Sequence, residues 1–204
     1  PDLTIPLPPS LTAFTGMDAL AHCLEAYSSD IFHPLSQGIA LEGMKIIKNN
    51  LLEDSNNGNN INARANMLTS SSMGSIAFQK GLGAIHSLSH PVGAIYDTHH
   101  GLTNAVFMPY VLIRNREAIE NKIVDLSRYL NLSNPSFNSF LDWILDLRKS
   151  LSIPHTLKEL IDDDSNFKKM SVMALNDPST ASNPIKLNQD DFLKLYQNSF
   201  EGIL

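Results

Sequence analysis

Apolar residues along most of this chain recur every three to four positions, which is the period of an α-helix. In residues 15–29, for example, Met17, Leu20, Leu24 and Tyr27 would share one helix face. The same period marks the segments 35–49, 61–79, 100–115, 118–130, 134–151 and 189–200. Strict apolar–polar alternation, which would indicate half-buried strands, is absent at useful length. We therefore expect an all-α domain of roughly eight to ten helices.

Polar residues and prolines predict where several of these helices begin, end or bend. Asn134 followed by Pro135 is typical of a helix N-terminus, and Asn188 would cap the last helix. Residues 53–60 contain Asn and Gly and are expected to form a polar loop. Pro109 lies inside a strongly apolar helical segment, so we expect a kink or a break there.

The opening of the chain differs from the rest, because four prolines fall within its first ten residues. A proline disfavours helical geometry in the residue before it. We therefore expect residues 1–15 to form an extended connector and residues 16–204 to form the helical domain. With no methionine at position 1, we also expect this chain to be part of something longer.

Composition narrows the classes of function. The chain has 204 residues, 43% of them hydrophobic, and a net charge of −6, which argues against a general basic surface for nucleic acid or anionic membrane. No apolar run reaches the roughly 18 residues of a membrane span, and no signal peptide opens the chain, so we expect a cytoplasmic protein. The single cysteine, Cys23, excludes a zinc site built from several thiolates. Any metal would be held by nitrogen and oxygen.

Histidines concentrate in one apolar, glycine-rich segment. Four of the seven lie in residues 81–101, namely His86, His90, His99 and His100. Each buried imidazole needs partners for two ring nitrogens, so several in one apolar segment are easily explained if a cation accepts some of them as neutral ligands. The alternative is that they are hydrogen-bonded residues of a helical core.

A second candidate is the pair Asp18 and His22 in GMDALAH. A spacing of four places both side chains on one helix face, where they can share a ligand. The alternative is that residues 15–18 form a capping box, in which Asp18 only caps the backbone and His22 is an ordinary helix residue.

Three stretches together resemble a known family. They are PPSLTAFTGMDALAHCLEAYSS, AFQKGLGAIHSLSHPVGAIYDTHHGLTNAVFMPYVL and, more weakly, NPIKLNQDDF. The chain resembles the iron-containing (group III) alcohol dehydrogenases over essentially its whole length, but only their C-terminal helical domain, which has the dehydroquinate synthase-like fold. The resemblance implies four ligands for a divalent metal: Asp18, His22, His86 and His100.

The resemblance also assigns the neighbouring histidines and the cofactors. It places His90 near the nicotinamide and substrate, as a catalytic residue for proton relay or substrate contact and not as a metal ligand. It also leaves His99 outside the ligand set. It implies Fe²⁺, whereas the nitrogen and oxygen ligands alone would equally admit Zn²⁺, Mn²⁺, Co²⁺ or Ni²⁺. Because protonated imidazoles cannot bind, metal loading should fail at low pH.

The function implied is hydride transfer between a primary alcohol or hydroxyacid and NAD(P). In the family the nicotinamide cofactor binds an N-terminal domain that nothing here supplies, so residues 1–15 would connect to it and the isolated chain would be inactive. The partners expected are a small alcohol or aldehyde and that domain, with no nucleic acid and no membrane, and a homo-oligomer stays open. Two alternatives remain: a free-standing metal-dependent hydrolase with His90 as general base, and a non-catalytic helical metal-binding domain.

Overall fold

The computed structural model describes residues 1–204, and all of its regular secondary structure is helical, which confirms the all-α expectation. None of its helices combines the length and the apolar character that a membrane span requires. Four short 3₁₀ helices lie outside the α-helices: η1 (Asp2–Thr4), η2 (Phe78–Lys80), η3 (Leu157–Glu159) and η4 (Pro178–Ser182). The eight α-helices are α1 (Pro9–Ser28), α2 (Pro34–Asn56), α3 (Ile61–Ala77), α4 (Ala84–Tyr96), α5 (His100–Tyr129), α6 (Phe137–Ser150), α7 (Phe167–Leu175) and α8 (Gln189–Glu201).

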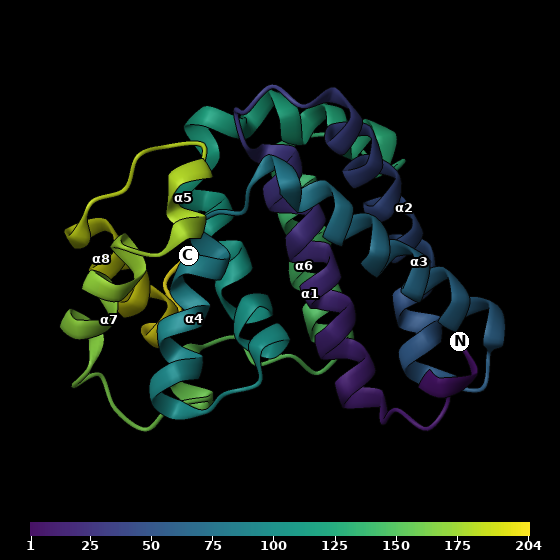
Figure 1. Ribbon diagram of the computed structural model, residues 1–204, viewed down its shortest axis with the longest axis horizontal. Helices are drawn as coiled ribbons and strands as arrows, with labels where there is room; N and C mark the ends of the chain where they lie inside the picture. Colours follow the sequence, from purple (N-terminus) through teal and green to yellow (C-terminus); the bar gives the residue numbers. More distant parts are fainter.

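Helices α1 and α5 form the centre of the molecule. Helix α1 packs against α2, α3 and α5, and α5 packs in turn against α4 and α6. Helices α7 and α8 pack against each other, and α7 also covers α4 (Figure 1). Both central helices carry long buried segments, and a single hydrophobic cluster runs through the whole chain. A polar side chain on the inner face of α1, α4 or α5 therefore lies where those three helices meet.

The opening of the chain is more helical than its prolines predict. Residues 2–4 form the 3₁₀ helix η1 and α1 begins at Pro9, so the expectation of an extended connector over residues 1–15 is wrong for residues 2–4 and 9–15. Proline is well suited to the first position of a helix, because its fixed φ is helical and its missing N–H would have no partner there. Pro8 keeps extended backbone geometry and supplies the N-cap. That the opening connects to a preceding domain stays a prediction.

Helix α5 runs unbroken for 30 residues, so the break considered at Pro109 does not occur and segments 100–115 and 118–130 form one helix. Pro109 is buried. Helix α2 likewise continues to Asn56, which shortens the expected 53–60 loop to four residues. In both helices, packing of the apolar face against neighbouring helices outweighs local residues that disfavour helix formation.

The two predicted N-caps have opposite outcomes. Asn188 caps α8, where its side chain accepts the Asp191 N–H, as expected. The cap of α6 is Ser136, not Asn134, and it forms a capping box with Ser139. Asn134 has a left-handed φ of 51°, so it belongs to the turn before the helix, a conformation that asparagine tolerates better than most residues.

Candidate metal centre

Three of the four predicted ligands converge from three different helices. Asp18 comes from α1, His86 from α4 and His100 from the first position of α5, and their ligand atoms all lie within 4.8 Å of one another. Asp18 Oδ1 is 3.8 Å from His86 Nε2 and 3.4 Å from His100 Nε2. A metal bonded at 2.0–2.2 Å in tetrahedral geometry holds its ligand atoms about 3.4 Å apart. The observed spacing is therefore close to what a cation would require.

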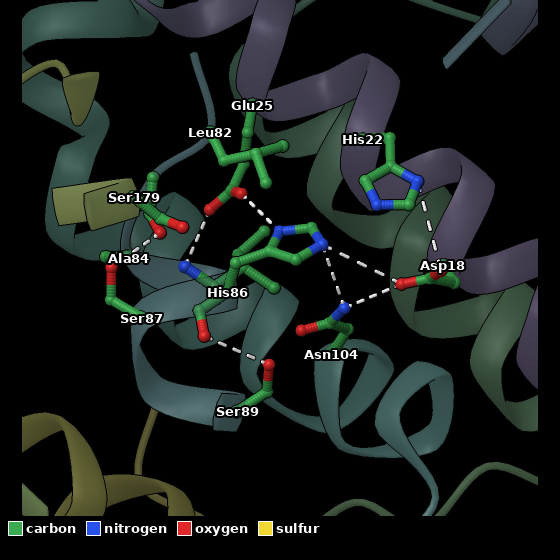
Figure 2. A network of polar contacts seen from close by, with 12 residues as sticks. Asp18, His22, Glu25, Leu82, Ala84, His86, Ser87, Ser89, Asn104 and Ser179 are labelled. Carbon is green, nitrogen blue, oxygen red and sulfur yellow. Dashed lines mark hydrogen bonds and ion pairs between the residues drawn. The ribbon is translucent and has the colours of Figure 1, made fainter. Parts of the chain in front are cut away.

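Asp18 does not cap a helix. Helix α1 begins nine residues earlier in the chain, and the Thr15 hydroxyl donates to the Leu11 carbonyl inside the helix. The capping-box alternative for residues 15–18 is thus wrong, because both residues lie in the helix interior. The Asp18 carboxylate projects toward α4 and α5 instead and accepts a hydrogen bond from Asn104 of α5 at 2.7 Å (Figure 2).

His22 lies beside the other three but outside their mutual 4.8 Å group. Its Nδ1 is 3.8 Å from Asp18 Oδ2, which is the i, i+4 proximity expected on one helix face. Its ring stacks on His86, with centroids 4.8 Å apart and an interplanar angle of 18° (Figure 2). The place of His22 in the ligand set remains a proposal.

The N-terminus of α5 reaches α1 at unusually short range. A Cβ added to Gly101 would lie 2.3 Å from the Phe14 carbonyl oxygen and 3.1 Å from Asp18 Cβ. Glycine at this position therefore lets His100 approach Asp18. His99 is the N-cap of α5 and accepts the Leu102 N–H through Nδ1, so it supports the helix end and is not one of the converging ligands.

Asn104 is a site residue that the sequence did not single out. It is fully buried, and its Nδ2 contacts Asp18 Oδ1 at 2.7 Å, His86 Nε2 at 3.2 Å and His100 Nε2 at 3.0 Å. An amide nitrogen has only two hydrogens for these three neighbours, and Asn104 Oδ1 has no partner. When both imidazoles present lone pairs, the three neighbouring atoms outnumber the hydrogens available to them. A cation held between those atoms would make up this lack of donors, so the residues present fit a divalent metal. The sequence signal that could have identified Asn104 is its position four residues after His100, which places both side chains on the same face of a helix.

Glu25 is a second residue that sequence reasoning missed. Its side chain is buried, and its Oε2 lies 2.6 Å from His86 Nδ1. Glu25 follows Asp18 by seven positions and therefore lies on the same face of α1, next to the inner end of α4. The sequence signal that could have identified Glu25 is a charged residue seven positions after Asp18, on a helix face that is otherwise largely apolar.

The protonation of the imidazoles follows from burial and from these carboxylates. Burial lowers the pKa of His22 and of His100, in both cases against the opposing attraction of Asp18. Burial also disfavours the charged form of His86, but the Glu25 carboxylate outweighs it, and the pKa of His86 is raised. His22 and His100 are therefore neutral near pH 7 and ready to act as ligands.

The cluster formed by Asp18, His22, His86 and His100 is buried on one side and open to solvent on the other. The His86 side chain is 1% exposed and that of Asp18 24%, whereas His100 is 42% exposed and His90 43%. His90 stacks on His100 with ring centroids 5.3 Å apart and an interplanar angle of 11°. The side of these two exposed rings is therefore the one from which a small molecule can reach the cluster.

His90 is held by a carboxylate from a distant part of the chain. Its Nδ1 lies 2.8 Å from Oδ2 of Asp177, 87 residues further on, and Asp177 Oδ1 accepts the Ser179 N–H. Although burial would raise the pKa of the Asp177 carboxyl, the hydrogen bonds from His90 and Ser179 lower it. No spacing in the sequence pointed to Asp177, because the contact exists only in the folded chain.

Comparison with known proteins agrees with this arrangement. Residues 12–200 match the profile of the "Fe-containing alcohol dehydrogenase family, C-terminal". Over 98% of its length, the chain is 36% identical to the 4-hydroxybutyrate dehydrogenase of Cupriavidus necator and 35% identical to the 1,3-propanediol dehydrogenase of Klebsiella pneumoniae. Each match covers 54% of the relative, so the chain spans about half the length of the curated relatives it matches.

Solved structures give the same result. A 1,3-propanediol oxidoreductase superposes with a TM-score of 0.92 at 32% identity, over 96% of this chain and 53% of that one. The alcohol dehydrogenase from Oenococcus oeni superposes with a TM-score of 0.90 at 29% identity, with the same shares covered. The chain therefore belongs to the iron-containing alcohol dehydrogenase family and corresponds to its C-terminal half.

Proposed function

We propose that this chain is the metal-binding half of an NAD(P)-dependent alcohol dehydrogenase. Four side chains would hold the divalent cation: Asp18, His22, His86 and His100. The observation that carries the proposal is the convergence of three of their ligand atoms, from three helices, within 4.8 Å. Such a set of one carboxylate and imidazoles suits Fe²⁺, which the family description supports, and also suits Zn²⁺, Mn²⁺, Co²⁺ or Ni²⁺.

A divalent cation in this position would act as a Lewis acid that favours the ionised form of an alcohol hydroxyl. The residues around it supply binding and proton handling. Asp177 accepts a hydrogen bond from Nδ1 of His90, which leaves Nε2 as the nitrogen that can accept or return the substrate proton. His90 is exposed beside His100, so it can contact a substrate that enters from the open side.

The substrate class proposed is a small primary alcohol or hydroxyacid, with the corresponding aldehyde as the other partner in the reaction. The names of the relatives, which include a 4-hydroxybutyrate dehydrogenase and 1,3-propanediol dehydrogenases, support this class. The hydride would pass to or from a nicotinamide held by a separate N-terminal domain, since the relatives are about twice the length of this chain. The chain alone would bind metal but would not oxidise alcohol.

Metal content of the purified chain tests the site directly. We expect about one equivalent of divalent metal by elemental analysis after loading at neutral pH, and loss of most of it in Asp18→Ala and in His100→Ala. His155→Ala is the matched control, because His155 is an exposed histidine outside the cluster. Unchanged metal content in both site variants would refute the ligand assignment.

A turnover assay tests the rest of the proposal. The isolated chain, loaded with Fe²⁺ and supplied with NAD⁺ or NADP⁺ and a primary alcohol, should show no reduction of the cofactor. Cofactor reduction by the chain alone would contradict the need for a second domain. Hydrolytic turnover without any nicotinamide would instead favour a metal-dependent hydrolase.

A further inference from the structure

The Glu25 carboxylate binds two donors of helix α4 at once. Its Oε2 lies 2.6 Å from Nδ1 of His86 (Figure 2). Its Oε1 accepts the backbone N–H of Ile85 at 2.6 Å. The Glu25 side chain is 6% exposed and makes no other ion pair. The two bonds join α1 to the turn of α4 from which His86 projects.

The carboxylate decides which nitrogen of His86 carries the proton. An ionised carboxylate is only an acceptor, so Nδ1 must be the donor. In the neutral ring, Nε2 is then an acceptor, and it faces Asp18 and the Asn104 amide nitrogen. The opposite tautomer would place an N–H against the Asn104 NH₂ group, with two donors facing each other. In the neutral ring, the two closest contacts, Glu25 at Nδ1 and the Asn104 amide nitrogen at Nε2, therefore both favour a hydrogen at Nδ1 and a lone pair at Nε2.

The backbone contact fixes the position of the ring as well as its tautomer. The Ile85 N–H belongs to the first turn of α4, where backbone donors have no partner within the helix. The N-cap of α4 is Gly83, which has no side chain to supply one. A Cβ on Gly83 would lie 3.0 Å from Glu25 Oε1, so glycine also permits the close approach of the carboxylate.

We propose that Glu25 is a positioning residue that presents the lone pair of His86 Nε2 to the metal. It would not bind the metal itself, since its oxygens are committed to Nδ1 of His86 and to the Ile85 N–H. A partner of this kind, behind a histidine ligand, typically contributes 10- to 100-fold to metal affinity. This role rests on the proposed metal site and adds to it a residue of α1 that acts only through His86.

Glu25→Gln is the informative substitution. The Ile85 N–H requires an acceptor, so the amide oxygen should take the place of Oε1 and leave the NH₂ group facing His86 Nδ1. The amide would then donate to Nδ1, and the hydrogen of the neutral ring would move to Nε2, where a metal must bind. Glu25→Asp keeps a carboxylate and should keep the original tautomer.

The first measurement is the tautomer of His86 in the metal-free chain, from ¹⁵N–¹H correlations of the ring at a pH where it is neutral. We expect a hydrogen on Nδ1 in the unmodified chain and in Glu25→Asp, and on Nε2 in Glu25→Gln. A merely structural role for Glu25 would leave the tautomer unchanged. A hydrogen on Nε2 in the unmodified chain, or the same tautomer in Glu25→Gln, would overturn the proposal.

The second measurement is affinity for Zn²⁺ or Co²⁺ by competition with a chelator. Glu25→Gln should bind about 10- to 100-fold more weakly, whereas Glu25→Asp should retain most of the affinity. Asp54→Asn is the control, because it also converts a buried carboxylate to an amide but contacts Arg64 and no proposed ligand. Unchanged affinity in Glu25→Gln would refute the role. An unmodified chain that binds neither metal would instead refute the proposed function itself, and with it the role of Glu25 toward the metal.

Discussion

Replacing Gly101 with alanine should separate two of the proposed ligands without removing either. The added Cβ would lie 2.3 Å from the Phe14 carbonyl oxygen and 2.9 Å from its carbonyl carbon, whereas Cβ atoms essentially never approach closer than 3.0 Å. Both contacts are backbone atoms of α1, which cannot rotate away as a side chain could. The first turn of α5 must therefore move from α1 by about 0.7 Å, because close-packed interiors leave no free space to absorb the clash.

The size of the effect follows from this displacement. His100 is the first residue of α5, and its Nε2 is now 3.4 Å from Asp18 Oδ1. Metal–ligand distances are tolerated only within about 0.2 Å, so a shift of about 0.7 Å should weaken metal binding at least tenfold, or about 1.4 kcal/mol. Overpacking of this kind also costs about 1–3 kcal/mol of stability, offset by up to about 1 kcal/mol from the better helix propensity of alanine.

The assay is Zn²⁺ affinity together with the urea midpoint of the metal-free chain. Gly38→Ala in α2 is the matched control, since a Cβ there meets nothing within 4 Å. It should leave metal affinity unchanged and raise stability by up to about 1 kcal/mol. If Gly101→Ala bound Zn²⁺ as tightly as the unmodified chain, the close approach of α5 to α1 would not set the geometry of the site.

Three further predictions concern buried groups outside the cluster. Arg64→Met should destabilise the fold by about 3 kcal/mol or more in urea unfolding, because it leaves the buried Asp54 carboxylate without its ion-pair partner, and adding Asp54→Asn should recover part of that loss. Burial lowers the pKa of Lys80 to about 8, so above that pH the folded chain binds fewer protons than the unfolded chain. The stability of the unmodified chain should therefore rise between about pH 8 and 10.5 relative to that of Lys80→Met. Parallel pH profiles of the two proteins would contradict this. Burial raises the pKa of the Cys23 thiol to about 12, so a thiol reagent should label it only at the rate of unfolding, and rapid labelling under native conditions would be the contrary result.

Hydrophobic periodicity was sufficient to predict the helical class, but not the helix ends. The errors share a cause, since Pro9, Pro109 and Asn134 each carry a local signal whose meaning depends on position. Proline opens α1 at its first turn and is accommodated inside α5, and asparagine precedes the cap of α6. Packing against neighbouring helices decides such cases, and a single sequence contains no direct record of that packing.

The candidate site likewise combines contacts that the sequence could predict with contacts that it could not. The spacing of four between Asp18 and His22 predicts their proximity, because one helix carries both. No spacing predicts that α1, α4 and α5 meet at Asp18, and family resemblance alone supplied that expectation. The contact between His90 and Asp177 joins segments 87 residues apart, so neither periodicity nor motif could have indicated it.

The charges of Asp18, Glu25 and the three nearby imidazoles give a separate reason to expect a cation beside His86 Nε2. Two carboxylates, Asp18 and Glu25, lie among three imidazoles, and burial keeps His22 and His100 neutral by lowering the pKa of each. With His86 neutral the group would carry a charge of about −2, and with His86 protonated about −1, in a region of low dielectric where unbalanced charge is costly. Although burial disfavours a charge on His86, the Glu25 carboxylate, aided by Asp18, raises the pKa of this ring, so both carboxylates favour a positive charge there. A divalent cation on Nε2 would replace that proton and balance both carboxylates, so proton and metal should compete for one nitrogen, and metal should be released as the pH falls.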